Sequence, residues 1–166
     1  MLRSKDFYLK DIYDTKGKKI GVIEDIYMDF YNGIIKGFKS SGSSLFSKKN
    51  YIDIEDVIEI GEDVIVYEEK KGDGLSFKSI KNMDVIDVNG FPKGVLEDIL
   101  VDDYNYCIKG IVISSGLIDR LIKGKEILLL DQCILGDEYI LYTGKSNVVF
   151  KSIPSNMENE YEFTKA

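Results

Sequence analysis

The sequence predicts an all-β protein that contains two small β-barrels in tandem, and two observations carry this prediction. Residues 14–37 and 87–110 align without a gap at an offset of 73, and 13 of the 24 positions are identical. A repeat of this kind indicates one structural unit used twice. Within each unit, short stretches of alternating apolar and polar residues are separated by Gly, Asn and Asp, a pattern typical of short strands joined by turns.

The repeated stretch is expected to form three strands. A first hairpin is predicted over 12–28, because a polar, glycine-containing turn separates two apolar stretches. Asn32-Gly33 then supplies the positive φ angles of a tight hairpin. The second unit has Asn105-Tyr106 at this place, so we expect its turn to differ in type. The third strand covers 34–40, and the glycine inside it, Gly37, indicates a bulge or a bend.

The second half of each unit is expected to add three more short strands. These are predicted near 51–54, 57–60 and 64–67 in the first unit, and near 127–130, 133–135 and 139–142 in the second. Gly61 aligns with Gly136 and Tyr67 with Tyr142, now at an offset of 75. We therefore expect two extra residues in the second unit, in the loop that follows its Ser-Ser-Gly, since surface loops tolerate insertions best.

These patterns predict the organisation of the whole chain. Its expected parts are a first barrel at 1–69, a linker at 70–76, a second barrel at 77–145, and a partly flexible C-terminal extension at 146–166. Phe77–Ile80 recurs as Phe150–Ile153, which we interpret as a starting strand used a third time without its unit. Two homologous barrels in one chain are expected to pack about a pseudo-twofold axis.

Composition limits the classes of function. The net charge is −7 and the lysines are scattered, which does not favour direct binding to nucleic acid. No apolar run approaches the roughly 18 residues of a membrane span, and the N-terminus has no signal-peptide pattern, so a cytoplasmic protein without membrane association is expected. There is no His, and Cys107 and Cys133 are expected to be buried free thiols. Neither a metal site nor a cofactor is predicted.

The repeated carboxylates are the first candidates for a site. Glu24, Asp25 and Asp29 recur as Glu97, Asp98 and Asp102. Adjacent residues on a strand point to opposite faces, so Glu24 and Asp25 cannot serve one site. We favour edge charges and turn hydrogen bonds as their role, with a site for a divalent cation or small ligand as the alternative. Nucleophilic catalysis lacks a His base, so no catalytic residue is assigned and the chain is not expected to be an enzyme.

Apolar residues in expected surface loops are the second candidates. Such residues either mark a surface for a partner or fold over the open end of their own barrel. The candidates for partner binding are Leu45, Phe46, Leu117, Ile118, Leu121 and Ile122.

Four features recur in both units: a turn with Asp and Gly, a Gly-Val-x-Glu-Asp-Ile stretch, an Ile-Lys-Gly strand and a closing Gly followed by two acidic residues. In the first unit these are Asp14, Gly17, Gly21–Ile26, Ile35–Gly37 and Gly61–Asp63; in the second they are Asp87, Gly90, Gly94–Ile99, Ile108–Gly110 and Gly136–Glu138. With these features, each unit resembles a PRC-barrel domain. Leu121–Ile127 also resembles the small sporulation-associated PRC-barrel proteins of Gram-positive bacteria. More distant relatives by this resemblance are the RimM C-terminal domain and the cytoplasmic domain of the photosynthetic reaction-centre H subunit.

The resemblance implies a function by binding, because such domains act mainly on other macromolecules and share no catalytic residue set. We therefore expect a non-enzymatic adaptor that binds a protein partner, in RNA processing, ribosome assembly or sporulation. The alternative is a regulatory module that responds to a small ligand or divalent cation through the repeated carboxylates. The partner is not identified by the sequence, and a homodimer stays open.

Overall fold

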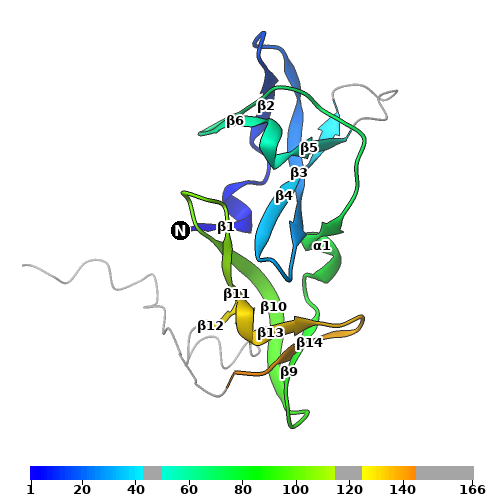
Figure 1. Ribbon diagram of the computed structural model, residues 1–166, viewed down its shortest axis with the longest axis vertical. Coiled ribbons are helices and arrows are strands. Elements are labelled where there is room, and N and C mark those ends of the chain that lie inside the picture. The colour runs from blue at the N-terminus through cyan, green and yellow to red at the C-terminus, as the bar shows by residue number, and fades with distance from the viewer. Residues whose placement is uncertain (43–49, 115–124, 145–166) are drawn as a thin grey trace, which may run out of the picture.

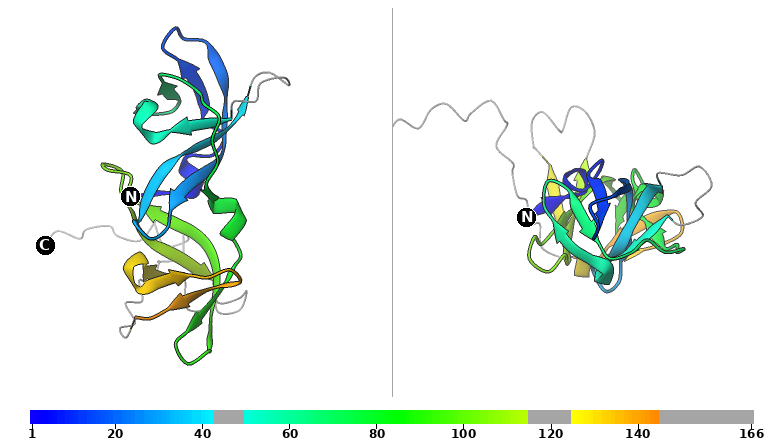
Figure 2. Two further views of the ribbon diagram at one scale, coloured as in Figure 1. Left: turned by 45° about the vertical axis from the view of Figure 1, so that its right-hand side comes forward. Right: turned by 90° about the horizontal axis from the view of Figure 1, so that it is seen from above.

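The computed structural model describes residues 1–42, 50–114 and 125–144. The fold is mainly β, as predicted: within these ranges two seven-stranded mixed sheets have the same strand order, and one short α-helix, α1 (Phe77–Ile80), follows the first sheet. Figure 1 shows the two units stacked along the long axis of the molecule, with β1 and α1 at mid-height, and the views of Figure 2 agree.

The first sheet has the strand order β5-β4-β3-β2-β7-β6, and β8 pairs with β3. Its elements are β2 (Asp11–Asp14), β3 (Lys19–Asp29), β4 (Ile34–Gly42), β5 (Tyr51–Asp53), the 3-10 helix η2 (Ile54–Asp56), β6 (Val57–Ile60), β7 (Val64–Val66) and β8 (Leu75–Ser76). β2 and β7 are parallel, whereas the other pairs are antiparallel.

The second sheet repeats this arrangement as β12-β11-β10-β9-β14-β13, and β1 pairs with β10. Its elements are β1 (Leu2–Arg3), the 3-10 helix η1 (Ser4–Asp6), β9 (Asp84–Asp87), β10 (Pro92–Val101), β11 (Ile108–Ser114), β12 (Glu126–Leu129), the 3-10 helix η3 (Leu130–Gln132), β13 (Cys133–Leu135) and β14 (Tyr139–Tyr142). β9 and β14 are the parallel pair.

The glycine inside the third strand marks a bulge, as predicted. Gly37 pairs with Tyr27 while the next pair is Met28 with Ile35, so Lys36 is the extra residue. A Cβ atom at Gly37 would lie 2.1 Å from the carbonyl oxygen of Ile52. Only glycine therefore lets β4 and β5 approach this closely.

The two hairpin turns have a left-handed residue at the same position, although the sequence predicted turns of different type. Gly33 has a φ of 63°, and Tyr106, its equivalent at the offset of 73, has a φ of 54°. Left-handed backbone is uncommon for a residue with a bulky side chain. Tyr106 is held there by contacts with the first unit: its carbonyl oxygen accepts from the N–H of Ile35, and its ring contacts that of Phe7.

The strand register corrects the predicted alignment of the second half. Phe38 pairs with Ile52, and its equivalent Ile111 pairs with Leu128. Ile52 and Leu128 are therefore equivalent at an offset of 76, so the second unit carries three extra residues by this point. The predicted match of Gly61 to Gly136, at an offset of 75, holds only around the turn that follows β6 and β13. β6 has a bulge after Val57, and β13 has no such extra residue, so the offset falls from 76 to 75 at this point. The pairing of Tyr67 with Tyr142 is wrong, because Asp14 pairs with Val66 where Asp87 pairs with Tyr142.

Phe77–Ile80 is a helical turn rather than the predicted strand. The side chain of Ser76 accepts a hydrogen bond from the backbone N–H of Ser79 at 3.3 Å, which caps the start of α1 as serine commonly does. Its echo at 150–153 lies outside the described residues. No helix in the described ranges is long and apolar enough to span a membrane.

Candidate functional site

Each unit receives a strand from the chain that leads into the other unit. Leu2 and Arg3 of β1 pair with Val101 and Leu100 of β10. Leu75 and Ser76 of β8 pair with Met28 and Tyr27 of β3. Every residue in the first set has its equivalent in the second at the offset of 73. We call β1 and β8 the entry strands, because each leads into one unit. Each pairs with the sheet of the other unit, so the entry strands are exchanged reciprocally.

The hairpin turns of the two units also meet reciprocally. The N–H of Ile35 donates to the carbonyl oxygen of Tyr106 at 3.3 Å, and the N–H of Ile108 donates to that of Gly33 at 2.7 Å. Between them Ile34 and Cys107 form an antiparallel bridge, and these two residues are themselves equivalent. The predicted pseudo-twofold axis is thus confirmed, and it passes through this bridge.

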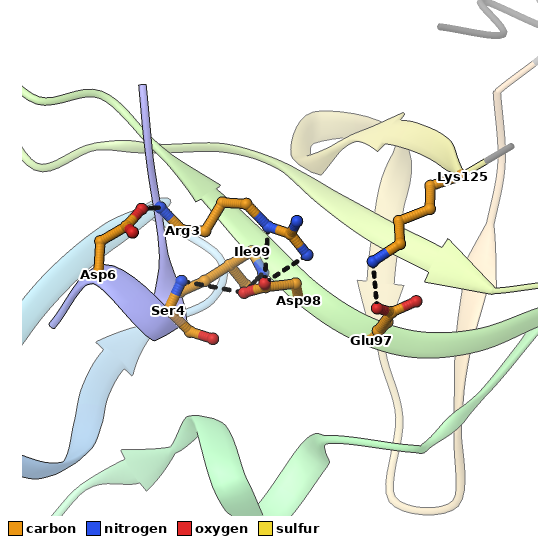
Figure 3. A network of polar contacts seen from close by, with 7 residues as sticks. All are labelled: Arg3, Ser4, Asp6, Glu97, Asp98, Ile99 and Lys125. Atoms are coloured by element: carbon orange, nitrogen blue, oxygen red, sulfur yellow. Dashed lines mark hydrogen bonds and ion pairs between the residues drawn. The ribbon is translucent and has the colours of Figure 1, made fainter. Parts of the chain in front are cut away.

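Asp98, the equivalent of Asp25 in the second unit, fixes the entry strand β1 (Figure 3). Asp98 is 5% exposed and accepts hydrogen bonds from the backbone N–H groups of Ser4 and Ile99, each at 2.9 Å. Its other oxygen accepts from the Nε atom of Arg3 at 2.8 Å and lies 2.7 Å from a terminal guanidinium nitrogen. Two nitrogens of the guanidinium therefore converge on one oxygen of Asp98, and a hydrogen bond between charged groups is stronger than one between neutral groups.

Asp25 plays the same part for β8 and α1. It is 4% exposed and accepts from the N–H of Ile26 at 2.8 Å and from the N–H of Lys78 at 3.2 Å. The hydroxyl of Ser76 donates to its other oxygen. Asp25 and Asp98 are therefore buried structural groups that join the units, rather than the edge charges we expected.

Tyr8 lies beside this junction and titrates abnormally. Its hydroxyl is 3.4 Å from an oxygen of Asp25. Burial, and after it the charge of Asp25, raises the pKa of Tyr8. Because the pKa is raised in the folded state, the folded chain keeps the phenolic proton of Tyr8 at a pH where the unfolded chain loses it. The free energy that Tyr8 contributes to folding is therefore complete below its pKa in the unfolded chain, about 10. It is lost as the pH rises above that value.

We expect the unfolding free energy to fall as the pH rises above about 10, and Tyr8→Phe to flatten part of that fall. The check is urea unfolding below and above this pH. Tyr104→Phe is the matched control, because Tyr104 is 94% exposed. An alkaline slope that is the same in Tyr8→Phe and in the native chain would contradict the assignment. Some slope will remain, since burial also raises the pKa of Tyr51, Tyr106 and Tyr142.

The other repeated carboxylates have separate local partners. Asp29 and Asp102 accept backbone N–H groups of their own turns, and these bonds lower the pKa of both carboxyls. The role of these two in turn hydrogen bonds is as expected. Glu24 pairs with Lys39 at 3.3 Å, and Glu97 pairs with Lys125. Within the described ranges, no three Asp, Glu, Cys or His residues gather as ligands for a metal ion.

The two cysteines are free. Cys133 is buried, as expected, and burial raises the pKa of its thiol to about 12. Cys107 is only half-buried, because it lies in the turn that meets Ile34 across the axis.

An apolar cleft on the second unit is the strongest candidate for a binding site. Its volume is about 280 Å³, and it is lined by Met1, Leu100, Lys109, Gly110, Ile127 and Leu129. Leu129 is 40% exposed and Met1 65% exposed. The six predicted partner-binding residues all lie outside the described residues. Sequence reasoning missed the cleft, because its lining comes from four separate segments.

A second cleft continues toward the junction of the units. Its volume is about 380 Å³, it shares Lys109 and Leu129 with the first cleft, and it also contacts Tyr31, Ile108 and Asp131. Tyr31 is 74% exposed, and its hydroxyl donates to the carbonyl oxygen of Leu135 at 2.8 Å. The second cleft is therefore lined by residues of both units, and it adjoins the first cleft through Lys109 and Leu129.

The equivalent place in the first unit has a different chemistry. Tyr27 and Tyr51 stand where the second unit has Leu100 and Ile127, and their ring centroids are 5.6 Å apart. The chain after β7 also crosses this place: Gly72 lies against the Tyr51 ring and Gly74 against Tyr27. The remaining cleft is partly lined by Asp29, Lys36 and Asp73. The aliphatic cleft thus exists on the second unit alone among the described residues.

The structure is thus a tandem of two β units of the same topology. A family model described as PRC-barrel domain matches residues 1–74. The first unit is therefore a PRC-barrel domain, and the second sheet repeats its topology strand for strand. A search of the curated proteins found no match to the chain.

Proposed function

We propose that this chain is a non-enzymatic adaptor of two PRC barrels that binds a protein partner through the aliphatic cleft of its second unit. The observation that carries the proposal is an exposed concave surface lined by Leu100, Ile127 and Leu129. Apolar patches of this kind on an otherwise charged surface mark sites of protein interaction. The resemblance to PRC-barrel proteins supports RNA processing, ribosome assembly or sporulation in the cytoplasm as the setting.

The test is affinity purification with mass spectrometry from the native cell, with and without ribonuclease. The bait is the full chain, compared with Leu129→Asp in the cleft. Val88→Asp is the matched control, because it places the same charge on an exposed apolar residue of the β9–β10 turn. We expect a partner that survives ribonuclease, is lost with Leu129→Asp and is kept with Val88→Asp. A partner that binds all three baits equally would refute the cleft as the site.

The alternative is a module that responds to a divalent cation through the repeated carboxylates. Asp25 and Asp98 each accept several hydrogen bonds at the junction, which leaves them poorly placed to ligate an ion. A ligand that binds only the native state must raise the melting temperature. We expect Ca²⁺ and Mg²⁺ at millimolar concentration to leave it unchanged, and a clear rise would favour the alternative.

A further inference from the structure

The first unit shows how an edge of this fold binds an extended segment. The N–H of Lys70 donates to the carbonyl oxygen of Tyr51 at 2.7 Å, and the N–H of Tyr51 donates to that of Lys70 at 3.1 Å. These two bonds form an antiparallel bridge at the outer edge of β5. Lys70 also pairs with Asp56 at 2.6 Å. A segment outside the barrel is therefore added to β5 through its backbone.

The second unit offers the equivalent edge at β12. Ile127 is the equivalent of Tyr51 by strand register. Tyr51 pairs with Lys39 of β4, and Ile127 pairs with Val112 of β11, which is the equivalent of Lys39 at the offset of 73. In the part of the chain that the structure describes, β12 pairs with β11 alone. Its edge residues stand directly beside the aliphatic cleft.

The second unit also accepts a segment that is distant in the sequence. In the first unit, Lys70 is followed closely by β8, which pairs with β3. In the second unit β1 takes the place of β8, and Arg3 is 95 residues from Asp98, which holds it. The strand that pairs with β10 therefore comes from a part of the chain that is not continuous with the last strand of this barrel.

The chemistry of the cleft selects the kind of segment. Asp56, the partner of Lys70, is replaced at the equivalent position by Gln132, which follows from the offset of 76. The tyrosines of the first unit are replaced by Leu100 and Ile127. A segment on β12 therefore meets aliphatic side chains and a neutral amide where Lys70 meets a carboxylate.

Building on the proposed function, we propose that the partner supplies an extended segment that pairs through its backbone with Ile127 at the edge of β12. One apolar side chain of that segment sits in the cleft between Met1, Leu100 and Leu129. This is recognition by strand addition, in which backbone hydrogen bonds give affinity and alternate side chains give specificity.

The experiment uses the full chain and random-sequence peptides selected on it by phage display. The best peptide is synthesised and titrated by fluorescence anisotropy against the native chain, Leu129→Asp and Val88→Asp. A series of peptides follows, each with one N-methylated backbone amide. We expect N-methylation to weaken binding at least tenfold at alternate positions only, since only those N–H groups face β12. Hydrogen exchange should show the peptide protecting amides of 126–129.

The following outcomes would overturn the proposal. Peptides that tolerate N-methylation at every position exclude strand addition, and peptides that protect amides elsewhere exclude the site. Affinity that rises strongly when the chain ends at Gly144 would show that residues 145–166 are the occupant. Self-association that is abolished by Leu129→Asp would identify a second copy of the chain. A cellular partner that requires Leu129, together with peptides insensitive to N-methylation, would keep the proposed function and refute strand addition.

Discussion

Replacing Asp98 with alanine is expected to lower the free energy of unfolding by about 3 kcal/mol. The change removes the acceptor of two N–H groups, those of Ser4 and Ile99, at a place where Asp98 is 5% exposed. Buried donors without an acceptor account for most of the loss. The Arg3 side chain is 29% exposed, so its guanidinium can return to water and contributes less. Urea denaturation measures the effect.

Asp25→Ala is expected to give a loss of similar size, because Asp25 holds β8 and α1 in the equivalent way. Asp103→Ala is the control: Asp103 is five residues from Asp98 and its side chain is 65% exposed, so a change within about 0.5 kcal/mol is expected. A cost for Asp98→Ala no greater than that of Asp103→Ala would contradict the role assigned to Asp98.

Replacing Phe7 with alanine is expected to cost about 4 kcal/mol. Phe7 is fully buried and contacts aromatic rings of both units. Its ring centroid lies 5.5 Å from that of Phe38 in the first sheet and 6.5 Å from that of Tyr106 in the turn of the second unit. Truncation therefore opens a cavity that neither unit can fill alone.

The same variant tests whether the units unfold together. Thermal unfolding followed by tyrosine fluorescence and by circular dichroism should show one shared transition at a lower temperature. Phe91→Ala, at a residue that is 66% exposed, is the control and should change little. Phe7→Leu keeps the variant measurable if the alanine variant fails to fold. Two separate transitions in the native chain would show that the units are independent.

The sequence predicted the fold well because its evidence is local. Alternation and turn residues located the strands, and Gly37 marked its bulge, since bulges and turns depend on neighbouring residues. Tyr106 misled the prediction of its turn, because tertiary contacts hold a tyrosine in left-handed backbone. The alignment of Tyr67 with Tyr142 failed because matching residue types concealed a bulge in β6.

The exchange of entry strands could not be predicted, because it depends on contacts between residues far apart in the chain. The repeat identified Asp25 and Asp98 as equivalent, yet nothing in the motif shows that each binds a strand leading into the other unit. The aliphatic cleft was missed for a related reason. The replacement of Tyr27 by Leu100 lies in the repeat at the offset of 73, but that of Tyr51 by Ile127 becomes visible only after the strand register gives the offset of 76.

The measurement that tests the reciprocal exchange most directly is hydrogen exchange of the chain after removal of residues 1–6. These residues precede the strands of the first sheet in the chain, but β1 pairs with Leu100 and Val101 of the second sheet. We predict that amides of 98–101 in β10 lose at least tenfold in protection while β2 and β7 keep theirs. A loss of protection confined to the first sheet would contradict the exchange.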